Sequence, residues 1–273
     1  MTTMTVQGQA PAATPGTVSR ARALLGSEWI KLRSVRSTYL TMAAAAVASV
    51  SIGAISSAMV SGYATTPPQV RAQFDSFSRT LSGLVFAQLA FGVLGGLAIS
   101  SEYGTGTIRT SLAAVPHRRC VLAAKAAVLT IAVTPLALVI SFASFLLGQA
   151  LLHSNGVSAT LATPGALTAV LGAAGYLIAV TLLGLGLGAV IRHSAGAITA
   201  VTGMVLLLPL ALGQFPSPWN VRLERLMPYL SPVIARHVPA PGYFTPGIAL
   251  LVSAVWAAAA VAAGLFLITR RDT

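Results

Sequence analysis

Six long apolar segments constrain the fold of this 273-residue chain more than any other feature. A helix rises about 1.5 Å per residue, so roughly twenty apolar residues cross the ~30 Å hydrocarbon core of a bilayer. We therefore predict an all-α polytopic membrane protein with six transmembrane helices. The predicted spans are residues 38–61, 82–100, 121–152, 166–191, 195–213 and 248–269.

The composition agrees with a membrane protein. Hydrophobic residues make up 55% of the chain and charged residues 8%, whereas ordinary soluble domains carry about 25% charged residues. A net charge of +12 would suggest nucleic acid in a soluble protein, but here the basic residues flank the apolar segments. We expect the lipid bilayer as a partner, and no nucleic acid.

The basic residues also predict the orientation. With the N-terminus inside, the inner segments hold twelve Lys and Arg residues and the outer segments hold five. The positive-inside rule then places both termini in the cytoplasm, across the plasma membrane (a bacterial inner membrane). Residues 1–17 have no charge and no apolar core, so we expect a disordered cytoplasmic tail before a single domain over 18–273.

Residues 18–37 combine basic and apolar side chains near helical spacing. Around Glu28, Trp29, Lys31 and Arg33 this pattern predicts an amphipathic helix that lies on an anionic leaflet. A plain basic anchor before the first span is the alternative. Both interpretations place the segment in the cytoplasm.

Residues 214–247 form a long outer connection with seven prolines and five aromatic residues. The segment is too short and too polar to span the membrane twice. Because Trp and Tyr favour the membrane interface, we expect short re-entrant helices that dip into it, with a solvated loop as the alternative.

The polar residues argue against chemistry within this chain. None of the five acids lies in a predicted span, which disfavours a proton-coupled carrier. The four histidines lack metal-ligand spacing, and a single cysteine, Cys120, cannot form an intrachain disulfide. No nucleotide-binding Gly-x-x-x-x-Gly-Lys-Ser/Thr motif is present, so active transport would need a separate ATPase subunit. We expect no catalytic residue, no metal and no cofactor in this chain.

The stretch from residue 101 to 125 predicts a tight cytoplasmic hairpin between the second and third spans. Glu102 ends the second span, Gly104 and Gly106 break the helix, and Thr107 caps a short new one. Such a hairpin suits the transfer of force from a docked partner, although a basic surface loop is the alternative. The basic residues that anchor the third span are Arg118, Arg119 and Lys125.

This hairpin resembles that of the permease subunits of type-2 ABC transporters, the exporters of drugs, antibiotics, peptides and polysaccharides. The residues that follow the family spacing are Glu102, Gly106, Thr107, Ile108, Pro116, Arg118 or Arg119, and Lys125. Residues 27–33 look like the N-terminal interfacial helix of the same family. The resemblance covers nearly the whole chain, because six spans and a long last outer segment also match.

The resemblance implies two permease chains, identical or homologous, with two ATP-binding subunits that hold ATP and Mg. It implies that the hairpin is a coupling helix docked on the ATPase, which the N-terminal helix also touches. Tyr103 departs from the charged or polar residue that is common at its position. The implied docking residues are Glu102, Tyr103, Gly104, Gly106, Thr107, Ile108, Arg109, Pro116, Arg118 and Arg119.

Small and polar residues within the spans suggest helix contacts. Gly92 with Gly96, and Gly184 with Gly188, form Gly-x-x-x-Gly pairs that allow close packing, although a glycine-rich chain also produces such pairs by chance. Gln88 either forms a hydrogen bond to another helix or faces a substrate path.

We therefore expect a permease subunit of an efflux transporter of the drug or antibiotic-resistance type. Its nearly uncharged spans favour a lipophilic or amphiphilic compound over an ion or a sugar. A non-transporting membrane scaffold, immunity or sensor component is the rival, since its sequence could look the same. A proton-driven carrier ranks third because the predicted spans lack a carboxylate.

Overall fold

The structure is a computed structural model that describes residues 17–34, 36–60, 67, 74–107, 118–234, 242 and 244–271. Every regular element in these ranges is helical, in agreement with the predicted fold class. The elements are α1 (Thr17–Ser34), α2 (Arg36–Ala58), α4 (Ser76–Leu81), α5 (Leu84–Gly104), α7 (Arg118–His153), α8 (Ala166–Ile191), α9 (Ser194–Thr202), the π-helical turn η2 (Gly203–Leu207), α10 (Leu208–Leu212), α11 (Trp219–Glu224), α12 (Leu230–Ile234) and α13 (Pro246–Arg271). Residues 1–16 of the predicted tail lie outside the described ranges.

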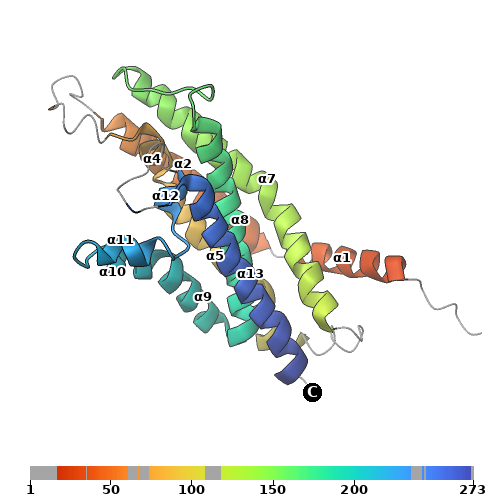
Figure 1. The fold of residues 1–273 in the computed structure, drawn as a ribbon. Coiled ribbons are helices and arrows are strands. Elements are labelled where there is room, and N and C mark those ends of the chain that lie inside the picture. The colour runs from red at the N-terminus through yellow and green to blue at the C-terminus, as the bar shows by residue number, and fades with distance from the viewer. Residues whose placement is uncertain are drawn as a thin grey trace, which may run out of the picture.

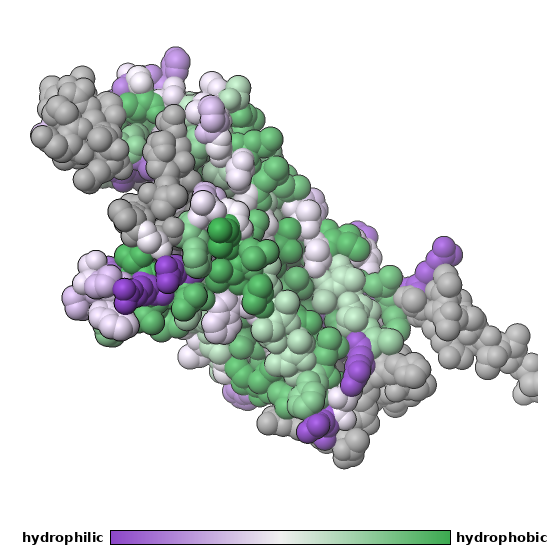
Figure 2. Space-filling model, in the orientation of Figure 1, coloured by the Kyte–Doolittle hydropathy of each residue, from purple (hydrophilic) through white to green (hydrophobic). Residues whose placement is uncertain are grey.

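Six helical segments are long and apolar enough to cross a membrane, which confirms the predicted number of spans. Figure 2 shows hydrophobic residues over most of the visible face, with hydrophilic residues at its margins. The bounds match to within a few residues, except that α5 continues past residue 100 to Gly104. Glu102 therefore lies in the last turn of α5, at the end of the second candidate span, because the helix does not end before Gly104.

α8 is the central helix of the bundle. In its most apolar stretch 67% of the residues are buried, a larger share than in any other candidate span. It packs against α5, α7 and α13, which lie around it in Figure 1. A helix that is apolar on all sides must be surrounded by other helices or by lipid, and here protein covers most of it.

α5 and α8 approach each other backbone to backbone. A Cβ added at Gly184 would lie 2.1 Å from the carbonyl oxygen of Gly92, and one at Gly188 would lie 2.6 Å from that of Gly96. Gly95, which the sequence analysis did not single out, would place a Cβ 1.9 Å from a backbone oxygen of α8. No side chain fits in these spaces, so the small residues set the separation of the two helices.

Gln88 joins the same two helices through its side chain. It is buried in α5, and its Oε1 accepts a hydrogen bond of 2.7 Å from the hydroxyl of Tyr176 in α8. That hydroxyl also lies 3.3 Å from the carbonyl oxygen of Pro228. Of the two alternatives for Gln88, the structure therefore shows the interhelical hydrogen bond.

The fifth span is not a regular helix throughout. It runs from Ser194 to Leu212 and contains the π-helical turn η2, at whose end the N–H of Leu208 donates to the carbonyl of Gly203. Pro209 follows directly and has no N–H to donate to the preceding turn. A π turn is a common way to absorb such a break.

α4 is a short buried helix that lies before the second predicted span, where the sequence analysis expected no helix. Asp75 caps it, since its carboxylate accepts hydrogen bonds from the backbone N–H of Phe77 at 2.9 Å and from the hydroxyl of Ser78 at 3.0 Å. Phe77 and Leu81 are fully buried. The aspartate at a helix start was the available sequence signal.

Two short helices, α11 and α12, lie in the described part of the predicted outer connection, as expected for residues 214–247. α12 packs against α8 and α13. The depth of these helices in a membrane stays a prediction, and residues 235–241 and 243 lie outside the described ranges.

α1 and the C-terminal end of α13 lie at the same end of the bundle (Figure 1). An even number of spans requires this arrangement. The side of the membrane on which this end lies stays a prediction.

The α5–α8 contact predicts the effect of one added methyl group. Gly184→Ala would force the two backbones apart, and overpacking of this kind costs about 1–3 kcal/mol. We expect a lower midpoint of thermal unfolding in detergent. Gly203→Ala is the matched control, because a Cβ there meets no atom within 4 Å, and it should leave the midpoint unchanged or raise it. Equal midpoints for the two variants would contradict the backbone contact.

Candidate functional site

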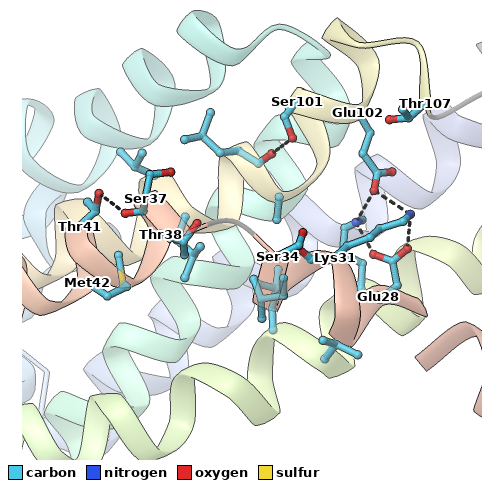
Figure 3. Close-up of a pocket in the computed structure, with 18 of the residues that line it drawn as sticks. Glu28, Lys31, Ser34, Ser37, Thr38, Thr41, Met42, Ser101, Glu102 and Thr107 are labelled. Carbon is cyan, nitrogen blue, oxygen red and sulfur yellow. Dashed lines mark hydrogen bonds and ion pairs between the residues drawn. The ribbon is translucent and has the colours of Figure 1, made fainter. Parts of the chain in front are cut away.

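Four charged side chains meet at the end of the bundle where α1 lies. Glu28 and Lys31 come from α1, Glu102 from the last turn of α5, and Lys125 from the second turn of α7. Lys31 Nζ lies 2.8 Å from Glu28 Oε1 and 3.0 Å from Glu102 Oε1, as Figure 3 shows. Lys125 Nζ lies 2.9 Å from Glu102 Oε1 and pairs with Glu28 Oε2. We call these four residues the ion cluster.

The ion cluster is neutral and largely buried. The side chains of Glu28, Lys125 and Glu102 are 4%, 6% and 10% exposed, whereas that of Lys31 is 42% exposed. Charges leave water only when each meets an opposite charge in good geometry. Docking of α1 on the bundle therefore depends on α5, which supplies Glu102, and on α7, which supplies Lys125.

The electrostatics of α1 follow from this burial and pairing. Burial would raise the pKa of Glu28, but the charges of Lys125 and Lys31 outweigh it and hold that pKa below its ordinary value. For Lys31, burial acts to lower the pKa, and the hydrogen bonds to Glu28 and Glu102 outweigh it, so the pKa lies above its ordinary value. Both groups are thus held in their charged forms.

A cavity of about 490 Å³ adjoins the ion cluster between α1, α2, α5 and α7. Along α5 the lining is polar near the cluster and apolar further into the span. The lining residues are Glu28, Lys31, Leu32, Ser34, Ser37, Thr38, Thr41, Met42, Ala90, Val93, Leu94, Leu97, Ala98, Ser101, Glu102, Thr105, Thr107, Lys125, Val128 and Leu129.

The structure brings together only some of the predicted site residues. Glu28, Lys31 and Glu102 join one cluster, whereas Trp29 and Arg33 lie on the exposed side of α1. The guanidinium of Arg192, in the turn between α8 and α9, lies 5.0 Å from the ring centroid of Tyr103.

The predicted coupling hairpin is described only at its two ends. α5 ends at Gly104, and Gly106 has a φ of +73°, a left-handed conformation that glycine adopts readily. Thr107 lines the cavity, and Arg119 is exposed at the start of α7, where Arg118 is the first residue. The predicted residues that lie outside the described ranges are Ile108, Arg109 and Pro116.

Sequence reasoning missed the role of Lys125, which it treated as an anchor of the third span. The signal was the lysine count: the chain has only Lys31 and Lys125, and both join the ion cluster. Spacing along the chain could not pair them with Glu28 and Glu102, since the Lys125–Glu28 contact joins residues 97 positions apart.

No group of three or more His, Cys, Asp and Glu side chains in the described ranges lies close enough to hold a metal ion. The ion cluster pairs its carboxylates with lysines instead. Its chemistry is therefore that of a mechanical link between helices.

Comparison with known families decides what kind of membrane protein this is. The family described as "ABC-2 family transporter protein" matches residues 24–210, more than half of the chain. The chain belongs to the ABC-2 transporter family. ABC-2 chains are membrane permeases without an ATPase of their own, and membership implies an ATP-binding partner subunit. No curated protein and no solved structure matches the chain.

The family match starts before the ion cluster and includes all four of its residues. It ends within the fifth span, so α11, α12 and α13 lie beyond it. The part of the ABC-2 permease that carries the ion cluster and the cavity is thus the part that the family shares.

Removing one lysine of the permease tests whether the cluster docks α1. Lys125→Met leaves two buried carboxylates without one of their partners, and breaking a buried pair costs about 3–5 kcal/mol. We expect α1 to detach and trypsin to cleave after Lys31 or Arg33 roughly tenfold faster or more.

The matched control for this variant is Arg119→Met, which removes one positive charge from an exposed position on the same helix. It should leave the cleavage rate unchanged. Equal rates for both variants would show that α1 is held by something other than the ion cluster.

The direction of the pKa of Glu28 predicts an acid limit for docking. Because that pKa is below its ordinary 4.5 in the folded permease, Glu28 stabilises docking above pH 4.5, and this contribution is lost as the pH falls through the lower folded value. Lys31 contributes below its ordinary 10.5, and its contribution is lost as the pH rises through its raised value. Docking should therefore hold from pH 4.5 to 10.5.

Two spin labels can measure this limit, one on the exposed native Cys120 and one on Arg33→Cys. The distance distribution between them should stay narrow at neutral pH and broaden only in acid below pH 4.5 or in strong base. In a Glu28→Gln background the acid step should shrink. Broadening near pH 7 in the unmodified cluster would count against the pKa assignments.

Proposed function

We propose that the permease belongs to an exporter that moves a lipophilic or amphiphilic compound (a drug, antibiotic or peptide) across the plasma membrane. A separate subunit would hydrolyse the ATP. The observation that carries this proposal is the ion cluster, which ties α1 to α5 and α7 where the predicted coupling hairpin leaves and re-enters the bundle.

The proposed mechanism rests on three rigid helices, α1, α5 and α7, that meet at the ion cluster. A partner that docks on the hairpin of residues 102–119 and on α1 would push three helices at once, because Glu28, Glu102 and Lys125 hold their ends together. α5 runs from the ion cluster to the close backbone contact with α8, where glycines of both helices meet. A displacement of the ion cluster would thus move α5 against α8 at the centre of the bundle. It would favour the inward-facing and the outward-facing arrangement in turn.

The polarity of the spans supports the proposed substrate class. Gln88 and Tyr176, two polar groups at the centre of the bundle, bond to each other. The ion cluster is neutral and lies at one end. A compound that partitions into the bilayer would suit such walls better than a hydrophilic solute.

The proposed assembly has two permease chains, identical or homologous, and two ATP-binding subunits that carry ATP and Mg. Both termini of the permease would lie in the cytoplasm, on the side of the ATPases. A role in efflux and in antibiotic resistance would follow if the cargo is toxic to the cell.

A non-transporting scaffold, immunity or sensor component remains the second candidate function. Its supporting observation is that the ion cluster would hold α1 in place equally well in a protein that moves nothing. Flux driven by ATP separates the two functions.

Two variants test the proposed coupling. Arg118→Glu with Arg119→Glu reverses the charge of the hairpin end and should reduce co-purification of the ATPase. Lys125→Met detaches α1 but leaves the hairpin, so it should weaken that association less than the hairpin reversal does and lower ATP-driven uptake of a lipophilic dye into inside-out vesicles roughly tenfold. Uptake is lost because the docked subunit no longer moves the three helices together.

Arg222→Glu is the control, since it reverses the charge of one arginine in α11, in the predicted outer connection. It should change neither association nor uptake. If no ATPase accompanies the unmodified permease, or if the ATPase binds and no substrate moves, the scaffold function is favoured.

A further inference from the structure

Arg192 has a left-handed backbone conformation, with a φ of 62°, and no other non-glycine residue in the described ranges has a positive φ. It lies in the turn between α8 and α9, where its N–H donates to the carbonyl oxygen of Gly188 and closes α8. Glycine is the usual residue at such a position, because a Cβ makes the left-handed conformation unfavourable. Strain of this kind in a structure points to a task for the side chain.

The side chain of Arg192 joins two other helices. Its guanidinium lies 5.0 Å from the ring centroid of Tyr103, in the last turn of α5. A cation within ~6 Å of a ring centroid is attracted by the π-electrons of the ring. Its Nη2 also donates a hydrogen bond of 3.3 Å to the carbonyl oxygen of Leu267, near the C-terminal end of α13. One residue thus ties the α8–α9 turn to both α5 and α13.

Neighbouring contacts hold the two partners of this link in place. Tyr103 packs against a cluster of buried apolar side chains from α5, α7, α8 and α13, among them Leu185 and Ile268. One turn earlier in α5, the hydroxyl of Ser100 donates to that of Ser194, the first residue of α9, at 3.1 Å. The α8–α9 turn is therefore held to α5 at two points.

The last turn of α5 makes two different links through adjacent residues. Glu102 joins α1 and α7 through the ion cluster, whereas Tyr103 joins the α8–α9 turn and α13 through Arg192. Consecutive residues of an α-helix point roughly 100° apart, so the two links leave α5 in different directions. Both directly precede the predicted coupling hairpin. A displacement of the hairpin would reach these two groups of helices by separate routes.

We propose that Arg192 is a positioning residue that carries motion of the hairpin to the α8–α9 turn and to the end of α13. The inference rests on the proposed export function and deepens it, because it assigns a residue to the step between the docked ATPase and the inner helices. A turn that only closed α8 would be better served by glycine, which adopts this conformation without strain. Without the Arg192 side chain, the ion cluster still moves α1, α5 and α7, but the end of α13 no longer follows.

The number of dye molecules moved per ATP hydrolysed tests this role. It is measured with a lipophilic dye in inside-out vesicles that hold the permease and its ATPase, and the thermal midpoint is measured in detergent. Arg192→Gly removes the side chain and the backbone strain together, so the midpoint should stay within about 3 °C of the unmodified protein. The dye moved per ATP should fall roughly tenfold.

Two substitutions of Tyr103 test the same link from the other side. Tyr103→Phe keeps the ring and should keep the ratio of dye to ATP, whereas Tyr103→Leu keeps an apolar side chain but removes the ring, and should lower the ratio. Combining Tyr103→Leu with Arg192→Gly should lower it no further than either change alone, because both break one contact. Phe266→Leu is the control, since it removes the ring that lies 4.3 Å from the guanidinium of Arg270 within α13 alone. It should leave the ratio unchanged.

The outcomes separate this role from export itself. If the unmodified permease with its ATPase moves no dye, the export function fails and the role of Arg192 fails with it. If it moves dye, and Arg192→Gly and Tyr103→Leu move as much per ATP as Phe266→Leu, the role of Arg192 is overturned while export stands. Trypsin cleavage after Lys31 or Arg33 should be unchanged in Arg192→Gly, because the ion cluster is intact. Faster cleavage would contradict the two separate routes.

Discussion

The close contact between α5 and α8 is the constraint on which the rest of the bundle depends. Gly95, Gly184 and Gly188 face backbone atoms of the opposite helix with no room for a side chain. Between membrane helices there is little hydrophobic gain from association, so close van der Waals contact of this kind takes its place. Gln88 and Tyr176 add a hydrogen bond to the same interface, away from water.

α5 connects this contact to the ion cluster. The helix that carries Gly95 also carries Glu102 in its last turn. The ion cluster at the end of the bundle and the α5–α8 contact at its centre therefore share one rigid helix. The cavity lies beside this helix, and its two ends reflect the two parts of α5, apolar within the span and polar at the end.

The residues of the site show how far spacing along a chain can predict a structure. Glu28, Lys31 and Glu102 were recognisable as site residues because charges are rare in this sequence and these lie beside apolar segments. Their pairing with Lys125 was not predictable, since it joins three helices that are distant in sequence. Gly95 was missed for a related reason. The Gly-x-x-x-Gly pattern identifies two glycines on one helix, whereas the contact between α5 and α8 depends on which face each helix turns toward the other.

The sequence by itself determined the six membrane helices, the approximate bounds of each, and the polar segments between them, because hydrocarbon thickness sets the length of an apolar helix. It also indicated the transporter family through the residues around Glu102. Only the tertiary structure decided that α8 lies at the centre, that α5 runs on to Gly104, and that two lysines and two glutamates meet at one point. The physical reason is that hydropathy measures transfer into lipid along one helix, whereas neighbours and buried charge pairs depend on how several helices pack.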